Sequence, residues 1–174
     1  AMLLFSHLHL QSIGDLDEQS YFSKMSSIGL ILDDWPNDDL FQTMDGHFFI
    51  TNRLACKLIK SELTGFNIKK VDRVISGPMW RTKYPDFNLD NYYKLTTSGE
   101  IGKVDLFFFE DSYLVASERA LSFLRENHVI YAPYNLIDGT FESYFHSDKI
   151  LFWMSEGSSK QYLVEEIRNK YSNS

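Results

Sequence analysis

The sequence has few of the residues that form disulfide bonds or membrane-spanning helices. Cys56 is the only cysteine among 174 residues, so an internal disulfide and a cysteine-based zinc framework are excluded. No uncharged apolar stretch approaches the roughly 20 residues that a membrane-spanning helix needs. Residues 2–10 contain two histidines but no basic leader and no small-residue cleavage site, which argues against a signal peptide. We therefore expect a soluble cytoplasmic protein without a membrane partner.

Recognisable catalytic motifs are also missing. The chain has no Gly-x-Ser-x-Gly, no His-Glu-x-x-His and no paired Cys-x-x-Cys, and the glycines at 99–103 lack the spacing of a phosphate-binding loop. Cys56 lies inside a predicted helix, where a lone thiol usually packs in the core. His7 and His9 share one side of a predicted strand, but no motif supplies further metal ligands. We predict no catalytic, cofactor-binding or metal-binding residue, and a protein that is not an enzyme.

One enzymatic alternative stays open. His128 and His146 have Glu142 and Asp148 nearby in the sequence, and a small hydrolase or lyase could be assembled from histidines and carboxylates. This hypothesis requires a pocket that gathers at least two of these side chains.

Charge is abundant and unevenly distributed. The net charge is −7, which disfavours nonspecific binding to nucleic acid and favours a basic partner. Residues 15–39 hold seven acids and one lysine, a net charge of −6, whereas residues 53–83 hold eight bases and two acids, a net charge of +6. A nucleic-acid-binding accessory protein is a second alternative, for which the basic segment offers basic and aromatic side chains: Lys69, Lys70, Arg73, Trp80 and Arg81.

The hydrophobic pattern predicts a single domain over residues 1–174, of the α+β class, with a mixed, mainly antiparallel sheet. Hydrophobic residues make up 44% of the chain, enough for a substantial core. Alternation predicts strands at 3–10, 104–109 and 149–154, the last followed by a C-terminal helix after Ser158 or Ser159. Residues 11–45 are expected to be largely irregular with one short strand, and residues 76–104 to be loop with one short helix near 91–95.

Two strand-helix-strand units are predicted within that domain. In the first, strand 48–50 runs into Thr51 as helix N-cap, the helix buries Leu54, Ala55, Leu58 and Ile59, and a strand follows at 66–71. In the second, strand 113–116 precedes the cap Ser117, the helix buries Ala120, Leu121 and Leu124, and a strand follows at 129–132. The offset in residue number from Thr51 to Ser117 also superposes Arg53 on Arg119, which suggests an internal repeat. We call this spacing the repeat offset. General likeness between strand-helix-strand units is the alternative explanation.

Several short motifs resemble those of a known group of proteins. They are Phe48-Phe49-Ile50-Thr51-Asn52-Arg53-Leu54-Ala55, then Leu63-Thr64-Gly65-Phe66, then Tyr113-Leu114-Val115-Ala116-Ser117-Glu118-Arg119-Ala120, with Trp35 and Asp39-Leu40-Phe41 upstream. Over residues 35–135 the chain is similar to immunity proteins of bacterial polymorphic-toxin and contact-dependent growth inhibition systems. The resemblance implies a small cytoplasmic protein that binds and blocks one cognate toxin domain and holds no catalytic residues.

The acidic segment is the predicted partner surface. Toxins delivered between cells are often nucleases, which are basic in order to hold a phosphate backbone, and an acidic inhibitor is steered toward such a partner. Trp35 and Phe41 could anchor an interface, although burial in this protein's own core is slightly favoured for both. The predicted partner-binding residues are Asp33, Asp34, Trp35, Asp38 and Asp39, extended by Asp15, Asp17 and Glu18.

Overall fold

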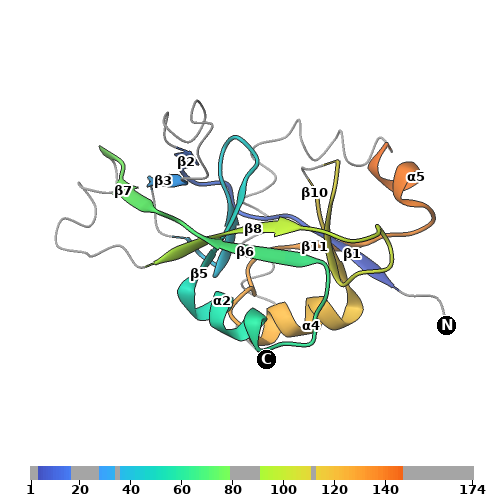
Figure 1. Cartoon of the computed structure of the whole chain (residues 1–174). Coiled ribbons are helices and arrows are strands. Elements are labelled where there is room, and N and C mark those ends of the chain that lie inside the picture. The colour runs from blue at the N-terminus through green and yellow to red at the C-terminus, as the bar shows by residue number, and fades with distance from the viewer. Residues whose placement is uncertain (1–3, 17–27, 34–35, 79–90, 111–112, 147–174) are drawn as a thin grey trace, which may run out of the picture.

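The computed structural model describes residues 4–16, 28–33, 36–78, 91–110 and 113–146 (Figure 1). These residues form three sheets and three helices. All strand pairs are antiparallel except β3 with β7, which is parallel. The prediction of an α+β fold with mixed, mainly antiparallel strands is therefore confirmed. No helix in the described part of the chain is long and apolar enough to cross a membrane.

The first four-stranded sheet carries the first helix. Its strand order is β4-β5-β8-β6, and the strands are β4 (Leu40–Gln42), β5 (Phe48–Thr51), β8 (Tyr92–Thr97) and β6 (Phe66–Lys70). Helix α2 (Asn52–Ile59) follows β5 directly, because the Thr51 hydroxyl accepts a hydrogen bond from the Leu54 N–H and caps the helix. Such a cap is worth about 1 kcal/mol.

The second four-stranded sheet repeats this arrangement. Its order is β9-β10-β1-β11, and its strands are β9 (Leu106–Phe109), β10 (Tyr113–Ser117), β1 (Phe5–Leu8) and β11 (Tyr134–Leu136). Helix α4 (Glu118–Glu126) follows β10, and the Ser117 hydroxyl accepts a hydrogen bond from the Ala120 N–H. Both predicted N-caps are thus confirmed.

The strand registers of the two sheets correspond position by position. Thr51 pairs with Tyr92 in the first sheet, and Ser117, its counterpart by the repeat offset, pairs with Phe5 in the second. Lys69 pairs with Lys94, and Asn135, which lies at the same offset from Lys69, pairs with His7. The N-terminal strand β1 therefore takes, in the second sheet, the place that β8 takes in the first. Gene duplication as the origin of this correspondence stays a hypothesis.

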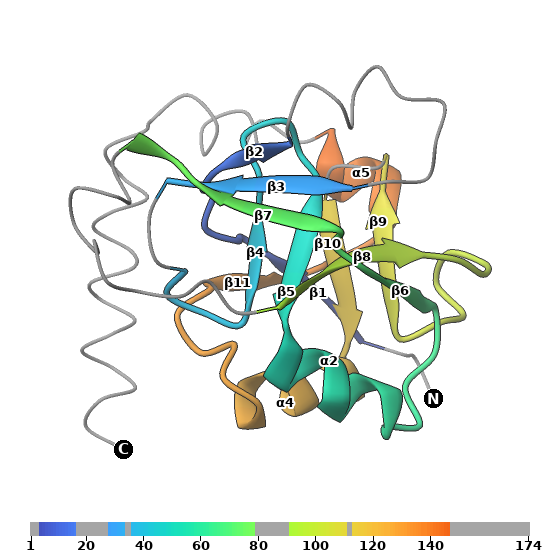
Figure 2. The same ribbon diagram turned by 60° about the vertical axis from the view of Figure 1, so that its left-hand side comes forward.

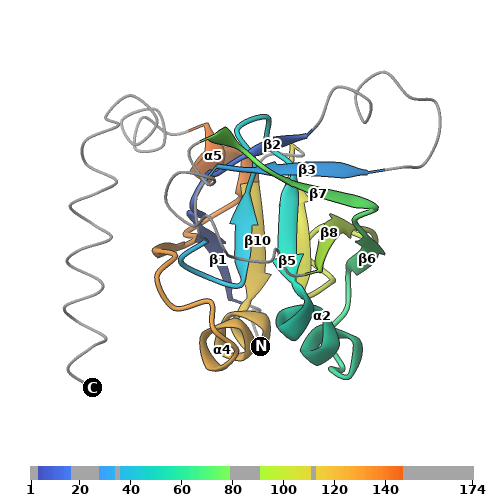
Figure 3. The same cartoon turned by 90° about the vertical axis from the view of Figure 1, so that its left-hand side faces the viewer.

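The main core lies between the two sheets and the two helices, which sit side by side at one end of the sheets (Figure 3). Leu54 and Leu58 of α2 and Ala120 and Leu124 of α4 are buried there. Burying one such leucine contributes about 1.5–3 kcal/mol. Across the sheets, the Phe48 and Phe108 rings stack with centroids 3.9 Å apart.

A different element covers the outer face of each sheet. A third sheet, in the order β2-β3-β7, lies across the first and closes a core around Phe41 and Phe49 (Figure 2). Its strands are β2 (Asp15–Leu16), β3 (Gly29–Leu32) and β7 (Arg73–Ser76). Short helix α5 (Phe141–Phe145) covers the second sheet and packs Phe145 against Phe109.

Five local predictions are wrong. Residues 91–95 belong to strand β8, not to a helix, and residues 11–45 contain the strands β2, β3 and β4 where one short strand was expected. The strand expected at 129–132 is a loop, and β11 begins at Tyr134 instead. In α2, Ile59 is 67% exposed and Cys56 is exposed, because only Leu54, Ala55 and Leu58 face the core. The strand at 149–154 and the C-terminal helix after Ser158 lie outside the described residues.

Candidate functional site

Three acidic residues gather at the end of the fold opposite the helices. Asp15 lies on β2, Asp33 follows β3, and Asp45 lies in the turn between β4 and β5. The Met44 N–H donates to the Gly14 carbonyl oxygen over 3.0 Å, which brings that turn against β2. We call Asp15, Asp33 and Asp45 the acidic end.

The carboxylates of the acidic end interact unfavourably with one another. Burial raises the pKa of Asp15, and the negative charges of Asp45 and Asp33 raise that pKa further. A raised carboxyl pKa means that the surroundings disfavour the charged form. The local potential at Asp15 is therefore negative, and a cation placed there would relieve the repulsion.

Basic side chains border the acidic end. Lys94 of β8 lies opposite Lys69 of β6. Burial lowers the pKa of Lys94, the charge of Asp45 opposes this change, and the charge of Lys69 adds to it. His47 lies 3.7 Å from Asp45, measured between Nε2 and Oδ2. Lys94 and His47, which lie outside the basic segment, thus interact with Asp45 within the fold.

Asp38 is used inside the fold. Its carboxylate accepts hydrogen bonds from the main-chain N–H groups of Ile130, Tyr131 and Ala132, over 2.8 to 3.2 Å. Burial raises the pKa of Asp38, and these three N–H groups, with the charge of Arg125, oppose that rise. Asp38 therefore fastens the loop after α4 to the start of the first unit, 92 to 94 residues earlier.

Asp39 forms a two-point ion pair with Arg53. The Arg53 guanidinium donates from Nε over 2.7 Å and from Nη2 over 2.9 Å to the two oxygens of Asp39. The pair lies beside a cleft of about 430 Å³, lined by Pro36, Asp38, Asp39, Thr51, Asn52, Arg53, Asn91 and Tyr92. Asp39 is buried, whereas the Arg53 side chain is 58% exposed.

The second unit contains the same ion pair. Arg119 donates from Nε over 3.3 Å and from Nη2 over 2.7 Å to Asp105, and the repeat offset relates these two residues to Arg53 and Asp39. Asp105 also accepts from the Ser117 hydroxyl and from the N–H and hydroxyl of Thr64. Burial acts to raise the pKa of Asp105, but the hydrogen bonds from Arg119, Ser117 and Thr64 lower it to about 2.

The structure divides the predicted partner-binding residues into three groups. Asp15 is exposed and Asp33 is half-buried at the acidic end. Asp38 and Asp39 are buried and bonded within the fold, and Phe41 is fully buried, as favoured from the sequence. The others, Asp17, Glu18, Asp34 and Trp35, lie outside the described residues. Neither Asp45 nor the second Asp-Arg pair was predicted. For the pair, the available signal was the tripeptide Asp-Leu-Phe, which occurs at 39–41 and again at 105–107.

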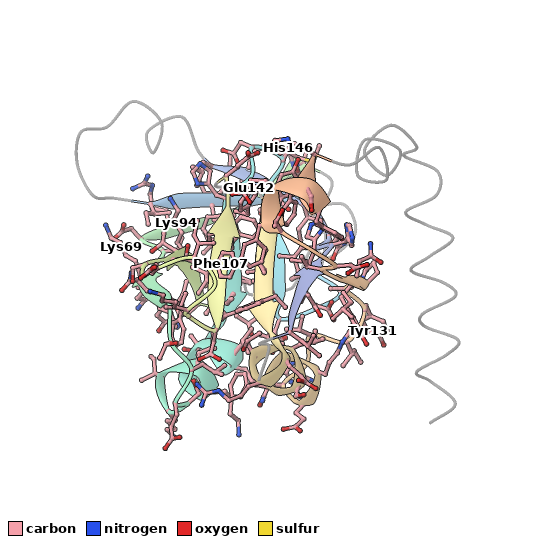
Figure 4. The ribbon with its side chains drawn as sticks, turned by 90° about the vertical axis from the view of Figure 1, so that its right-hand side faces the viewer. Lys69, Lys94, Phe107, Tyr131, Glu142 and His146 are labelled. Carbon is pink, nitrogen blue, oxygen red and sulfur yellow. The ribbon has the colours of Figure 1, made fainter. Side chains whose placement is uncertain are left out.

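His128 lies apart from the other described residues of the enzymatic alternative, whereas Glu142 and His146 are neighbours at α5. His128 follows α4, and His146 caps α5, two helices at opposite ends of the molecule (Figures 1 and 3). Figure 4 shows Glu142 and His146 together near α5, with Tyr131 of the loop after α4 far below them. His146 lies 3.4 Å from Glu110, measured between Nε2 and Oε1. Asp148 lies outside the described residues.

The remaining candidate histidines and basic residues lie in different parts of the described structure. His7 is buried, with Nδ1 3.3 Å from the Tyr144 hydroxyl oxygen, and burial and neighbouring His9 lower its pKa to about 3. No cluster of three metal-ligating side chains occurs among the residues that the structure describes. Lys69 and Lys94 lie at one flank (Figure 4), while Trp80 and Arg81, which the nucleic-acid alternative needs beside them, lie outside those residues.

Comparison with known proteins adds no family assignment. No protein-family model matches the chain, and no curated protein or solved structure matches it either.

Proposed function

We propose that this protein is a non-catalytic immunity protein that binds and neutralises a basic bacterial toxin domain in the cytoplasm, with a nuclease as the expected toxin class. The observation that carries the proposal is the acidic end, where the β4–β5 turn packs against β2 and the carboxylates of Asp15, Asp33 and Asp45 are close enough to repel one another. The resemblance of residues 35–135 to immunity proteins of polymorphic-toxin systems supplies the kind of partner.

Electrostatics favour a basic protein as the partner of this surface. Like charges held close together carry a free-energy cost in the unbound protein, and an opposite charge on a partner removes that cost. The same field accelerates the encounter, because steered association exceeds the usual rate by about 10 to 10³-fold at low salt. A basic nuclease domain has the charge that this surface attracts.

The shape of the fold is compatible with a binding role. Asp15 lies on β2, Asp33 directly follows β3, and Asp45 lies in the turn that joins β4 and β5, so all three are anchored to strands of two sheets that pack on each other. A preorganised surface loses little entropy on binding. Met44, 70% exposed in the same turn as Asp45, provides an apolar contact beside the charges.

The experiment that tests the proposal uses the reading frame directly upstream of this protein's gene. Its C-terminal domain is expressed with and without this protein, and growth and complex formation are measured. The proposal predicts arrested growth with the domain alone, restored growth with both, and a stable complex in size-exclusion chromatography. Restored growth without a complex would point to an enzymatic antidote and contradict the proposal, as would growth arrest that this protein does not relieve.

A further inference from the structure

The cleft beside Asp39 and Arg53 is separate from the acidic end, which lies at the other end of β4 and β5. We propose that this cleft binds a carboxylate group, held by the guanidinium of Arg53 and the side-chain amides of Asn52 and Asn91. Its volume of about 430 Å³ is in the range of small-molecule sites. The inference goes beyond toxin binding and does not depend on it.

The guanidinium of Arg53 is fixed on one edge and accessible on the other. Asp39 takes the edge formed by Nε and Nη2. Within the part of the chain that the structure describes, no acceptor is bonded to Nη1; the side chain is 58% exposed, and Arg53 lines the cleft. Arg presents five N–H donors in a planar fork that matches a carboxylate with two parallel hydrogen bonds. Asp39 thus orients an arginine whose second edge can take an oxygen ligand.

In the second unit, the corresponding arginine binds one oxygen besides its aspartate. Arg119 is held by Asp105 as Arg53 is by Asp39, and its Nη2 also donates to the Glu62 carbonyl oxygen over 3.2 Å. The loop after α4 is the counterpart of the loop after α2 that contains Glu62. It instead donates its main-chain N–H groups to Asp38 of the first unit. Among the described residues, no carbonyl oxygen accepts from Arg53 as that of Glu62 accepts from Arg119. The cleft lies beside Arg53 instead.

The charges around the cleft select the ligand's charge. Arg53 offsets Asp39, and three N–H groups and the charge of Arg125 offset Asp38. The first turn of α2 has no acidic residue, whereas Glu118 occupies that turn in α4. Both aspartates repel an anion, so a ligand's single negative charge is compatible with the cleft only beside Arg53, and a doubly charged phosphate would be repelled more strongly. Asn52 and Asn91 line the same cleft and can donate to the ligand's second oxygen.

The first arm of the test compares ligands by calorimetric titration of the full chain. The probes are propionate, the acid N-acetyl-Gly-Gly and its C-terminal amide. At least one acid is expected to bind saturably, with the amide about tenfold weaker or more than the peptide acid. Tighter binding of the peptide acid assigns the site to a peptide C-terminus, and tighter binding of propionate assigns it to a small organic acid. Equal binding of peptide acid and amide, or no saturable binding of either acid at millimolar concentration, overturns the inference.

The second arm uses variants with matched controls. Asn91→Asp places a negative charge in the cleft without altering the Asp39–Arg53 pair, and should weaken the acid by about tenfold or more. Asn67→Asp makes the same change at an exposed position of β6 and should leave binding unchanged. Arg53→Lys keeps the charge beside Asp39 but removes the fork, so a similar loss is expected. Acid binding that Asn91→Asp and Arg53→Lys leave unchanged, in folded protein, overturns the site.

Discussion

Arg119 repeats, in the second unit, the two-point contact that Arg53 makes with a buried aspartate in the first. The loop after each helix donates hydrogen bonds to an aspartate of the other unit. Thr64, after α2, donates to Asp105 of the second unit, and Ile130, after α4, donates to Asp38 of the first. Each half of the domain is thus fastened by the loop of the other, at the end where the two helices lie (Figure 3).

The two ion pairs provide a matched comparison of stability. Asp105 accepts from Arg119, Ser117 and Thr64, whereas Asp39 accepts side-chain hydrogen bonds from Arg53 among the described residues. Asp105→Ala leaves more donors unsatisfied, so it should lower the free energy of unfolding by about 3 kcal/mol, against about 1–2 kcal/mol for Asp39→Ala. Urea titration of both variants measures this difference. A larger loss for Asp39→Ala would contradict the structure.

Asp38 is predicted to stabilise the fold. Asp38→Ala removes the acceptor of three main-chain N–H groups, of which that of Ala132 is buried. Leaving these donors without partners should cost about 3 kcal/mol or more of the free energy of unfolding. Hydrogen exchange at Ile130, Tyr131 and Ala132 should accelerate in the variant at sub-denaturing conditions. Unchanged stability and exchange would mean that the carboxylate does not hold this loop.

His7 predicts a pH dependence of stability. Burial and His9 lower the pKa of folded His7 to about 3 from its ordinary value of 6.5. As the pH falls below 6.5, the unfolded state takes up a proton before the folded state does, so stability falls, by up to about 1.4 kcal/mol per pH unit. His47, whose pKa is also lowered chiefly by burial, contributes in the same direction.

The variant His7→Gln tests this prediction. Its stability should fall less steeply than that of the wild type between pH 6.5 and pH 4, as measured by denaturant titration at each pH. Asp105 contributes only near the lower end of that range and equally in both proteins, because its stabilisation is present above the unfolded pKa of 3.8 and is lost progressively from about pH 5 as the pH falls toward about 2. Identical slopes for variant and wild type would show that His7 takes up its proton in the folded state at ordinary pH.

Local sequence signals predicted the elements that are determined locally. Thr51 and Ser117 cap the expected helices, since a hydroxyl before an amphipathic stretch needs no distant partner. The pairing of β1 with β10, which joins distant parts of the chain, depends on tertiary packing and could not be predicted in the same way. Strand β8 was mistaken for a helix because tyrosines and a lysine at 92–94 suit either structure, and its neighbours β5 and β6 decide the outcome.

The candidate site was predicted only in part for a related reason. Sequence reasoning recognised the excess of acidic residues at 15–39 but not which carboxylates the fold would use. Asp38 and Asp39 find their partners at residues 130–132 and at Arg53, contacts that no local pattern reveals. Asp45 joins Asp15 and Asp33 only because the β4–β5 turn packs against β2. The excess of acidic residues predicted the acidic segment, but the tertiary structure determines which carboxylates belong to the acidic end.

The acidic end predicts opposite effects on stability and on binding. In the variant Asp15→Asn/Asp33→Asn/Asp45→Asn, loss of mutual repulsion should leave the free energy of unfolding unchanged or slightly higher, within about 0.5 kcal/mol. Loss of an attractive field should slow association with a basic partner. The control Glu126→Gln/Asp138→Asn/Glu142→Gln makes the same change in net charge at three exposed positions elsewhere.

The most direct measurement is the association rate of these variants, at two salt concentrations, with the domain from the upstream reading frame that we propose as the toxin. The account predicts that the triple variant of the acidic end associates about tenfold or more slowly at low salt and loses most of the salt dependence, while the control keeps both. Equal association rates and equal salt dependence for the two variants would contradict the claim that Asp15, Asp33 and Asp45 form the toxin-binding surface.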